Sequence, residues 1–316
     1  MPRQAPAPTR VAFTQERSYI RRMPKPLGRE QASLVAPSLN DSYEILPGRC
    51  DAGLLLICDH AVNTLPGDYG TLGLEPSELA RHIAYDIGAW GVTQRLARAL
   101  DVPAIGARFS RLLIDPNRGL DDPTLIMRLS DGAVVGGNRR IDAAERDKRV
   151  RLYYEPYHQA IDGLIETCMA AGVPPVLLSV HSFTELWKGE PRPWDAAILW
   201  DRDHRFAVPL LEALRAEPGV LVGENEPYDG KLAGDCMWQH GTRRGLPHTI
   251  IEVRQDLIRE DAGQALWAER IARATRAVLG RSDLAEALHK VQYFGSHTDS
   301  EDAPPFAGAA ARSGPS

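Results

Sequence analysis

Two histidines and one glutamate stand where apolar runs of the sequence give way to polar residues. His60 follows the run LLLICD, His181 lies in VLLSVHSF and Glu252 lies in TIIEVR. Imidazole and carboxylate groups that converge from such positions can bind Zn²⁺ at about 2.0–2.1 Å and leave one position for water, as in a catalytic zinc site. A histidine at the end of an apolar run is more often structural, and the HExxH pattern is absent, so this spacing alone is weak evidence.

The elements that must position these residues alternate along the chain. Six apolar runs have the length of buried strands, at residues 53–59, 103–107, 176–181, 196–200, 220–223 and 249–253. Helical patterns occupy residues 86–100 and 143–171, and Pro156 should kink or split the second one. Asp142 is a plausible N-cap and Gly172 a plausible C-terminal stop. We therefore expect an α/β fold with a mostly parallel sheet flanked by helices, with ligands beyond the carboxyl ends of the strands.

The composition is that of an ordinary globular protein. The 316 residues carry 37 Lys and Arg against 42 Asp and Glu, and 43% are hydrophobic. No stretch approaches the roughly 18 consecutive apolar residues of a membrane span. The four cysteines form no CxxC pair, so neither a disulfide scaffold nor a zinc finger is predicted, and a cytoplasmic location fits best.

Both ends of the chain differ from its middle. Residues 1–40 are predicted to be a disordered basic arm rich in proline, and residues 291–316 a disordered tail of small and polar residues. Residues 41–290 show no repeat and no long linker, which favours one catalytic domain. Because the chain is acidic outside the arm, nucleic acid is not an expected partner.

Five motifs carry a family resemblance. CDHAVNTLP (58–66), SRLLIDPNRG (110–119), SVHSF (179–183), NEPYDG (225–230) and IIEVRQDLI (250–258) resemble the N-formylglutamate amidohydrolase family over about residues 45–280. The resemblance implies a zinc-dependent amide hydrolase. It also implies a phosphorylase/hydrolase-like α/β fold related to zinc exopeptidases and cell-wall amidases.

The same resemblance implies a ligand set for the metal. His60 and His181 match the two family histidines, and Asp86 in AYDIGAW matches the acidic position between them. Asp86 could instead be a carboxylate that the dipole of a helix N-terminus favours, with Asp59, Glu75 and Glu78 as fallback ligands. Cys58 precedes His60 by two residues, but we interpret it as a core cysteine.

Glu252 is the expected general base and acid, because a zinc amide hydrolase needs one carboxylate that does not bind the metal. Such a residue takes a proton from the attacking water and returns it to the leaving nitrogen. Arg254 lies two residues further along the same predicted strand. A structural ion pair between Glu252 and Arg254 is therefore the alternative.

Arginines within the motifs are candidates for binding substrate carboxylates, because a guanidinium binds a carboxylate with two hydrogen bonds. They are Arg111, Arg118 and Arg254. Asn117 either donates to a substrate carbonyl or holds its loop. His240 is favoured over His248 as the donor to the tetrahedral oxyanion.

The predicted reaction is hydrolysis of N-formyl-L-glutamate, or a close analogue, to formate and L-glutamate with Zn²⁺. The sequence reads DHAVN where the histidine-utilisation enzymes of the family read closer to PHSG, so another N-acyl or amide amino acid is the alternative substrate. A non-catalytic relative that binds an anionic ligand is the alternative from another class. A nucleotide-binding protein is disfavoured, because neither GxGxxG nor GxxxxGK[ST] follows a strand. The expected partner is a small molecule, and no oligomeric state is predicted.

Overall fold

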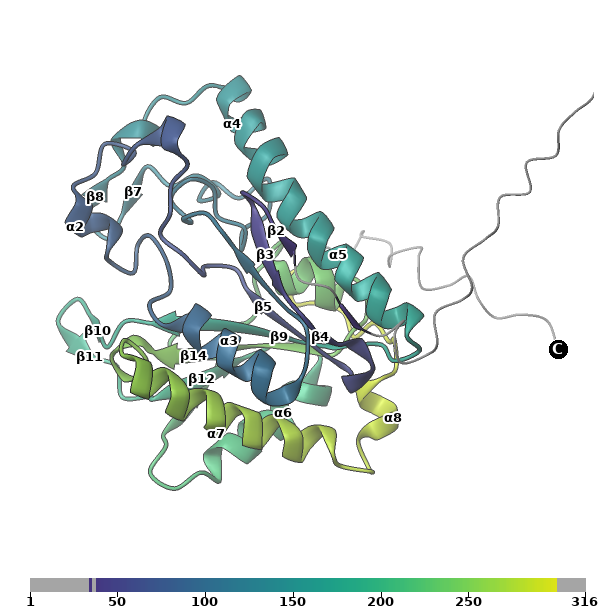
Figure 1. Ribbon diagram of the computed structural model, residues 1–316. Helices are drawn as coiled ribbons and strands as arrows, with labels where there is room; N and C mark the ends of the chain where they lie inside the picture. The colour runs from purple at the N-terminus through teal and green to yellow at the C-terminus, as the bar shows by residue number, and fades with distance from the viewer. Residues whose placement is uncertain (1–33, 36–37, 300–316) are drawn as a thin grey trace, which may run out of the picture.

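The protein is described by a computed structural model that covers residues 34–35 and 38–299 (Figure 1). Its centre is an eight-stranded sheet with the order β13-β12-β14-β9-β5-β6-β3-β2. In that order the strands are Val222–Glu224, Ala196–Leu199, His248–Arg254, Val176–Phe183, Leu54–Cys58, Ala104–Ala107, Tyr43–Leu46 and Ser38–Leu39. All six predicted strands are present, so the α/β fold is confirmed.

The sheet is mixed. Strands β14, β9, β5 and β6 are parallel to their neighbours at the centre, and β13 is parallel to β12. In contrast, β12 runs antiparallel to β14, and β3 runs antiparallel to both β6 and β2. The prediction of a mostly parallel sheet therefore holds for the centre but not for the edges. Strands β2 and β3 form a hairpin at one edge, which needs no crossover helix.

Helices cover both faces of the sheet. They are α2 (Pro76–Leu79), α3 (Ala89–Leu100), α4 (Ala143–Arg149), α5 (Glu155–Ala170), α6 (His204–Arg215), α7 (Asp261–Leu279) and α8 (Ala285–Leu288). In β5, Leu54 and Leu56 belong to the core that includes buried residues of α3, α6 and α7, whereas Leu55 and Ile57 belong to the core that includes those of α5. This alternation follows from the two-residue period of a strand. Figure 1 shows α3 and α7 on one side of the sheet and α5 on the other.

The predicted long helix is divided but not broken. Between α4 and α5 the chain makes a π-helical turn at Val150–Tyr154. Asp142 caps α4, because its side chain accepts a hydrogen bond from the Glu145 amide. Pro156 has no amide to donate to the Leu152 carbonyl, and the Ser42 hydroxyl donates to that carbonyl instead, at 2.7 Å. The helix ends before Gly172, which has a φ of +92°.

Several short strands and helical turns lie outside the central sheet. Three two-stranded hairpins or ladders pair β1 (Leu34–Val35) with β4 (Gly48–Arg49), β7 (Leu129–Ser130) with β8 (Ala133–Val134), and β10 (Leu186–Trp187) with β11 (Glu190–Pro191). A second π-helical turn, η5, spans Trp238–Thr242. Single 3₁₀ turns lie at Cys50–Ala52, Gly67–Tyr69, Gly136–Asn138 and Gln255–Leu257.

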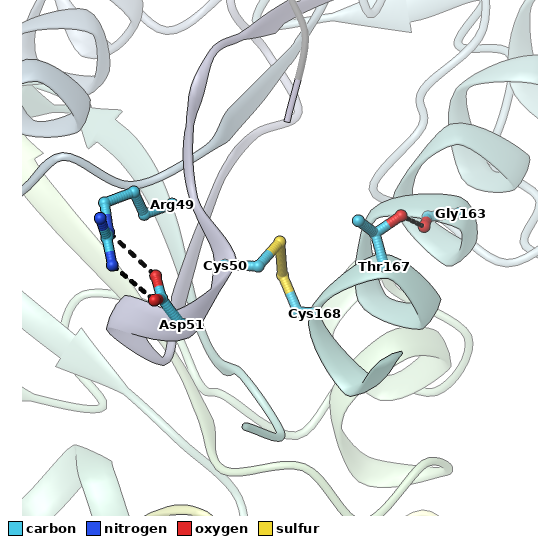
Figure 2. Close-up of a disulfide and its surroundings, with 6 residues drawn as sticks. All are labelled: Arg49, Cys50, Asp51, Gly163, Thr167 and Cys168. Atoms are coloured by element: carbon cyan, nitrogen blue, oxygen red, sulfur yellow. Dashed lines mark hydrogen bonds and ion pairs between the residues drawn. A yellow bond between two sulfur atoms is a disulfide. The ribbon is translucent and has the colours of Figure 1, made fainter. Parts of the chain in front are cut away.

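A disulfide joins the 3₁₀ turn before β5 to the C-terminal part of α5. It links Cys50 with Cys168 across 118 residues of sequence, as Figure 2 shows. Cys58 and Cys236 are free and buried, and Cys58 is a core residue as predicted. Disulfides persist mainly in oxidising compartments. The bond therefore does not support the predicted cytoplasmic location.

The predicted arm and tail lie mostly outside the described residues. Where the structure does describe them, they join the fold. Residues 34–35 and 38–39 form β1 and β2, and the Gln292 amide donates to the Gly245 carbonyl at 2.8 Å. The chain from residue 34 to 299 thus includes ordered residues that the prediction assigned to the arm and the tail. Among residues 34–35 and 38–299, no helix is long and apolar enough to cross a membrane.

Candidate active site

The carboxyl ends of the central strands bring the predicted residues together. His60 follows the end of β5, and His181 lies near the end of β9. Glu252 of β14 is paired with His181 in the register of the parallel ladder, so the two residues lie on neighbouring strands at the same height. Asp86 precedes α3, and its amide donates to the His60 carbonyl at 2.9 Å.

His60, Asp86 and His181 form a buried cluster whose possible ligand atoms all lie within 4.8 Å of one another. Oδ2 of Asp86 is 3.3 Å from Nδ1 of His60 and 2.8 Å from Nδ1 of His181. The two imidazole rings meet edge to face, with centroids 5.0 Å apart. Nδ1 of each ring therefore faces Oδ2 of Asp86.

The other nitrogen of each ring is held by a second carboxylate. Nε2 of His60 lies 2.7 Å from Oδ1 of Asp115, and Nε2 of His181 lies 3.1 Å from Oδ2 of Asp59. Carboxylates in this position fix the tautomer and the orientation of histidines that bind a metal. The Nδ1 atoms are thus the ones available to a metal ion.

The electrostatics of the cluster suit a cation. Burial alone would raise the pKa of Asp59, but the hydrogen bond and charge of His181 outweigh it and hold that pKa well below its usual value. Asp115 is also fully buried, and the charges of His60 and Arg111 keep its pKa low. Burial would lower the pKa of His181, but hydrogen bonds to Asp59 and Asp86 hold it well above the usual value. A metal ion could take the place of the proton on that ring.

Two buried imidazoles with an aspartate are a donor set that fits Zn²⁺. The alternative role of Asp86 at a helix terminus is not seen. Gly88 is the N-cap of α3, without a side-chain cap, and Asp86 contacts the two histidines. Of the fallback ligands, Asp59 holds His181, Glu78 pairs with Arg81 at 2.5 Å, and Glu75 is an exposed residue before α2.

Glu252 is buried beside this cluster. Its Oε2 has no hydrogen-bond partner among the described residues. Burial raises the pKa of Glu252 to about 7, with the positive charge of His181 opposing this and the negative charge of Asp86 adding to it. Arg254 does not neutralise it, because that guanidinium pairs with Asp256 at 2.7 Å and Asp195 at 3.3 Å. The alternative of a Glu252–Arg254 ion pair is therefore wrong.

Only one of the three predicted arginines contacts the cluster. Arg111 donates to Oδ1 of Asp86 at 3.2 Å and approaches Asp115 to 3.5 Å. Arg118 instead donates to Thr124 and to the Asn117 carbonyl. The Asn117 side chain accepts a hydrogen bond from the Cys236 amide at 3.0 Å, so it holds its loop.

The structure does not bring the other two predicted histidines into the cluster. His240 contacts His158 at 2.8 Å and Asp162 at 3.1 Å through its two ring nitrogens. His248 lies 2.8 Å from the Leu246 carbonyl and 3.1 Å from Thr242. Neither ring is directed at the His60–Asp86–His181 cluster by these contacts.

Sequence reasoning missed four residues beside the cluster. Asp115 and Tyr228 lie inside quoted motifs but were given no role, and His82 lies 3.5 Å from Asp86. Arg192 follows β11 outside every motif, and it donates to the Tyr228 hydroxyl at 3.1 Å. Its positive charge acts on Glu252. Nothing in the local sequence around Arg192 indicates this position, which depends on the β10–β11 hairpin.

A cavity of about 540 Å³ opens next to the cluster. Its lining includes His82 and Arg111, which both contact Asp86, and Tyr228. Cationic side chains of Arg81, Lys188 and Arg259 also line it. Asp131 lines it as well, and Arg81 and Arg259 pair with the acidic residues Asp131 and Glu185. The cationic side chains still outnumber the acidic one in the lining, so the cavity offers an anionic small molecule positive groups next to Asp86.

The fold and the site define the class of protein first. It is an α/β protein whose sheet carries, at one edge, two histidines backed by carboxylates, an aspartate and a buried glutamate with a raised pKa, which are the groups of a hydrolase. The chain belongs to the N-formylglutamate amidohydrolase family, since the sequence model of that family matches residues 52–259. The family consists of hydrolases that act on amide bonds.

Two solved structures resemble this fold. A gene product from Agrobacterium tumefaciens is 31% identical, with a TM-score of 0.71 over 76% of this chain and 96% of that one. An N-formylglutamate amidohydrolase from Ralstonia eutropha JMP134 is 22% identical, with a TM-score of 0.55 over 76% of this chain and 97% of that one. The second likeness concerns the fold alone. No curated protein matches the chain.

Proposed function

We propose that this protein hydrolyses the N-acyl amide of a small acidic amino acid, N-formyl-L-glutamate or a close analogue, with zinc as its cofactor. The observation that carries the proposal is the convergence of Nδ1 of His60, Nδ1 of His181 and Oδ2 of Asp86. Each histidine is backed by a carboxylate, and a buried glutamate lies beside the pair.

His60, Asp86 and His181 would hold the zinc ion. When bound there, zinc would lower the pKa of a water molecule toward neutrality and polarise the acyl carbonyl. Asp115 and Asp59 would keep the two rings in the orientation that this requires.

Glu252 would act as the general base and then as the general acid. Its pKa of about 7 suits both roles near neutral pH, because the carboxylate accepts a proton readily and the acid also gives it up readily. Its unpartnered oxygen is free to contact the attacking water. After attack, the proton passes to the leaving nitrogen, and the products are a carboxylic acid and a free amino acid.

Arg111 and Arg192 would bind the carboxylates of the substrate. Arg111 lines the cavity and contacts Asp86, while Arg192 stacks on Tyr228 with its guanidinium 5.0 Å from the ring centre. Arg118 and Arg254 remain candidates from the sequence, but each donates to neighbours of its own. We do not retain His240 as the donor to the tetrahedral oxygen, because its ring nitrogens contact His158 and Asp162.

Two broader parts of the proposal rest on the family resemblance: that the fold is related to zinc exopeptidases and cell-wall amidases, and that the protein acts on a free small molecule. The cytoplasmic location is a proposal that rests on the sparse cysteines of the sequence. The Cys50–Cys168 disulfide is the observation that opposes a reducing compartment.

The experiment that tests this function is a screen of formyl-, acetyl- and formimino-amino acids for release of free amine, with zinc and with chelator. We expect the largest kcat/KM for an N-formyl amino acid with an acidic side chain. A non-catalytic relative would bind such a compound without releasing amine. Turnover that prefers apolar N-acyl amino acids would contradict the role of the arginines.

A further inference from the structure

A second buried cluster of metal-binding side chains lies apart from the first. It consists of His158 in α5, Cys236 before η5 and His240 within η5, and their possible ligand atoms all lie within 4.8 Å of one another. None of the three belongs to the His60–Asp86–His181 cluster. π-helical turns are frequently found at functional sites.

As in the first cluster, the outer nitrogen of each imidazole is engaged by an oxygen atom. Nε2 of His158 donates to the Pro116 carbonyl at 3.0 Å, and Nδ1 of His240 lies 3.1 Å from Oδ1 of Asp162. Arg244 also donates to that oxygen, at 2.8 Å, and so fixes the carboxylate. With the outer nitrogens engaged, the inner nitrogens of His158 and His240 face each other at 2.8 Å.

We propose that His158, Cys236 and His240 form a second zinc site. One thiolate and two neutral imidazoles are a donor set that zinc prefers, and the outer hydrogen bonds are those that orient metal-binding histidines. Two nitrogens bound to one tetrahedral zinc ion lie about 3.3 Å apart, so the rings need to separate by only about half an ångström.

A cavity gives an ion access to this cluster and supplies a fourth ligand. It has a volume of about 630 Å³, and its lining includes His158, His240, Gln239 and Asp162. A water molecule from this cavity completes the tetrahedron. Cys236 is fully buried and its thiol interacts with Asp59, and the thiol proton is released when the metal binds.

The second zinc site would hold in place the segments that surround the proposed active site. It joins α5 to η5, and His158 also holds the Pro116 carbonyl in the loop that carries Asp115 and Asn117. Through Cys236 it contacts Asp59, the residue that orients His181. The second site is therefore a positioning site and takes no part in the bond cleavage. The inference stands independently of the proposed function.

Cobalt loading tests this inference, because only the second cluster contains a cysteine. The full chain, freed of metal and loaded with Co²⁺, is expected to show a sulfur-to-cobalt charge-transfer band in the near ultraviolet. Cys236→Ser should abolish the band, and His158→Gln should weaken or shift it. Metal analysis of the zinc-loaded protein should give one ion per chain fewer in the Cys236→Ser variant than in the wild type.

The controls separate this thiol and this site from the others. Cys58→Ser and the Cys50→Ser/Cys168→Ser double variant should keep the band, and so should His181→Ala, which alters only the first cluster. Absence of the band in folded wild-type protein would overturn the inference, even if no variant can be purified. A band that survives Cys236→Ser would overturn it as well, since the thiolate would then come from elsewhere. In either case His158 and His240 form only a hydrogen-bonded pair.

Discussion

At the scale of single residues, the proposed chemistry depends on Glu252, a carboxylate whose pKa is raised to about 7 by burial. Glu252 is 7% exposed, and its Oε2 lacks a partner among the described residues. In the folded protein, burial makes the charged form of Glu252 unfavourable, whereas the unfolded chain exposes the carboxylate to water. Glu252 is thus suited to exchanging protons and contributes no ion pair to stability.

The first prediction concerns Glu252→Gln. We expect kcat to fall by about 10²–10⁴ while zinc content stays normal, because a proton-transfer group is lost but no ligand is. The exposed Glu286→Gln variant is the matched control and should keep its kcat. Normal turnover in a folded, zinc-loaded Glu252→Gln variant would show that another group moves the proton.

The same variant makes a prediction about stability. The folded pKa of about 7 lies above the 4.5 of an exposed glutamate, so the stability that Glu252 contributes as an acid is present below about pH 4.5 and lost as the pH rises through 7. At pH 8 the metal-free Glu252→Gln protein should therefore be more stable than wild type, by up to about 3 kcal/mol. Melting temperatures of both metal-free proteins at pH 5 and pH 8 measure this. A lower melting temperature for the variant at pH 8 would indicate a stabilising partner for the carboxylate.

Asp115→Asn tests the residue behind His60. The amide keeps the shape of the side chain but removes the charge that favours the metal-binding form of the ring, so zinc affinity should fall about 10–100-fold. The zinc concentration that restores half of the activity to metal-free protein measures it. Asp283→Asn, at an exposed position, should leave that concentration unchanged. An unchanged value for Asp115→Asn as well would remove Asp115 from the site.

Arg111→Lys tests carboxylate recognition. Lysine keeps the charge but cannot make the paired hydrogen bonds of a guanidinium, so KM should rise by about tenfold or kcat/KM should fall to the same degree. Arg118→Lys and Arg254→Lys should have smaller effects, since these residues are bound to their own neighbours. Exposed Arg273→Lys is the control. Equal kinetics for Arg111→Lys and the control would place substrate binding elsewhere.

At the scale of elements, the sequence predicts the strands better than their arrangement. The strands β5, β9 and β14 are buried on both faces and contain apolar runs, which is the pattern of a buried strand between helices. The β2–β3 hairpin escaped prediction because its four-residue strand, YEIL, is only half-buried and has no strong period. Within the π-turn at residues 150–154, the Leu152 carbonyl accepts a hydrogen bond from Ser42, which is more than a hundred residues away.

The disulfide is another element that local sequence could not predict, because 118 residues separate its two cysteines. We expect thiol titration of the denatured, unreduced protein to find two thiols, those of Cys58 and Cys236, and four after reduction. Replacing both Cys50 and Cys168 with serine should lower the free energy of unfolding by about 2–5 kcal/mol. Four thiols before reduction would show that the bond does not form in the purified protein.

At the scale of the whole molecule, the site is assembled from strands that are distant in sequence and adjacent in the sheet. His60, His181 and Glu252 were predictable because each ends a strand, and parallel central strands bring such ends to one edge. Arg192 was not predictable, because its position depends on a hairpin that carries no motif. The sequence also did not indicate that His240 lies apart from the first cluster, because its position depends on how η5 packs against α5.

The central claim is that zinc held by His60, Asp86 and His181 is required for amide hydrolysis. The measurement that tests it most directly is the rate of formate release from N-formyl-L-glutamate as zinc is added back to chelator-treated protein. We expect no turnover without metal, a rise to a plateau as zinc is added, and no recovery in the His181→Ala variant. Full activity in protein shown by analysis to contain no metal would contradict the claim.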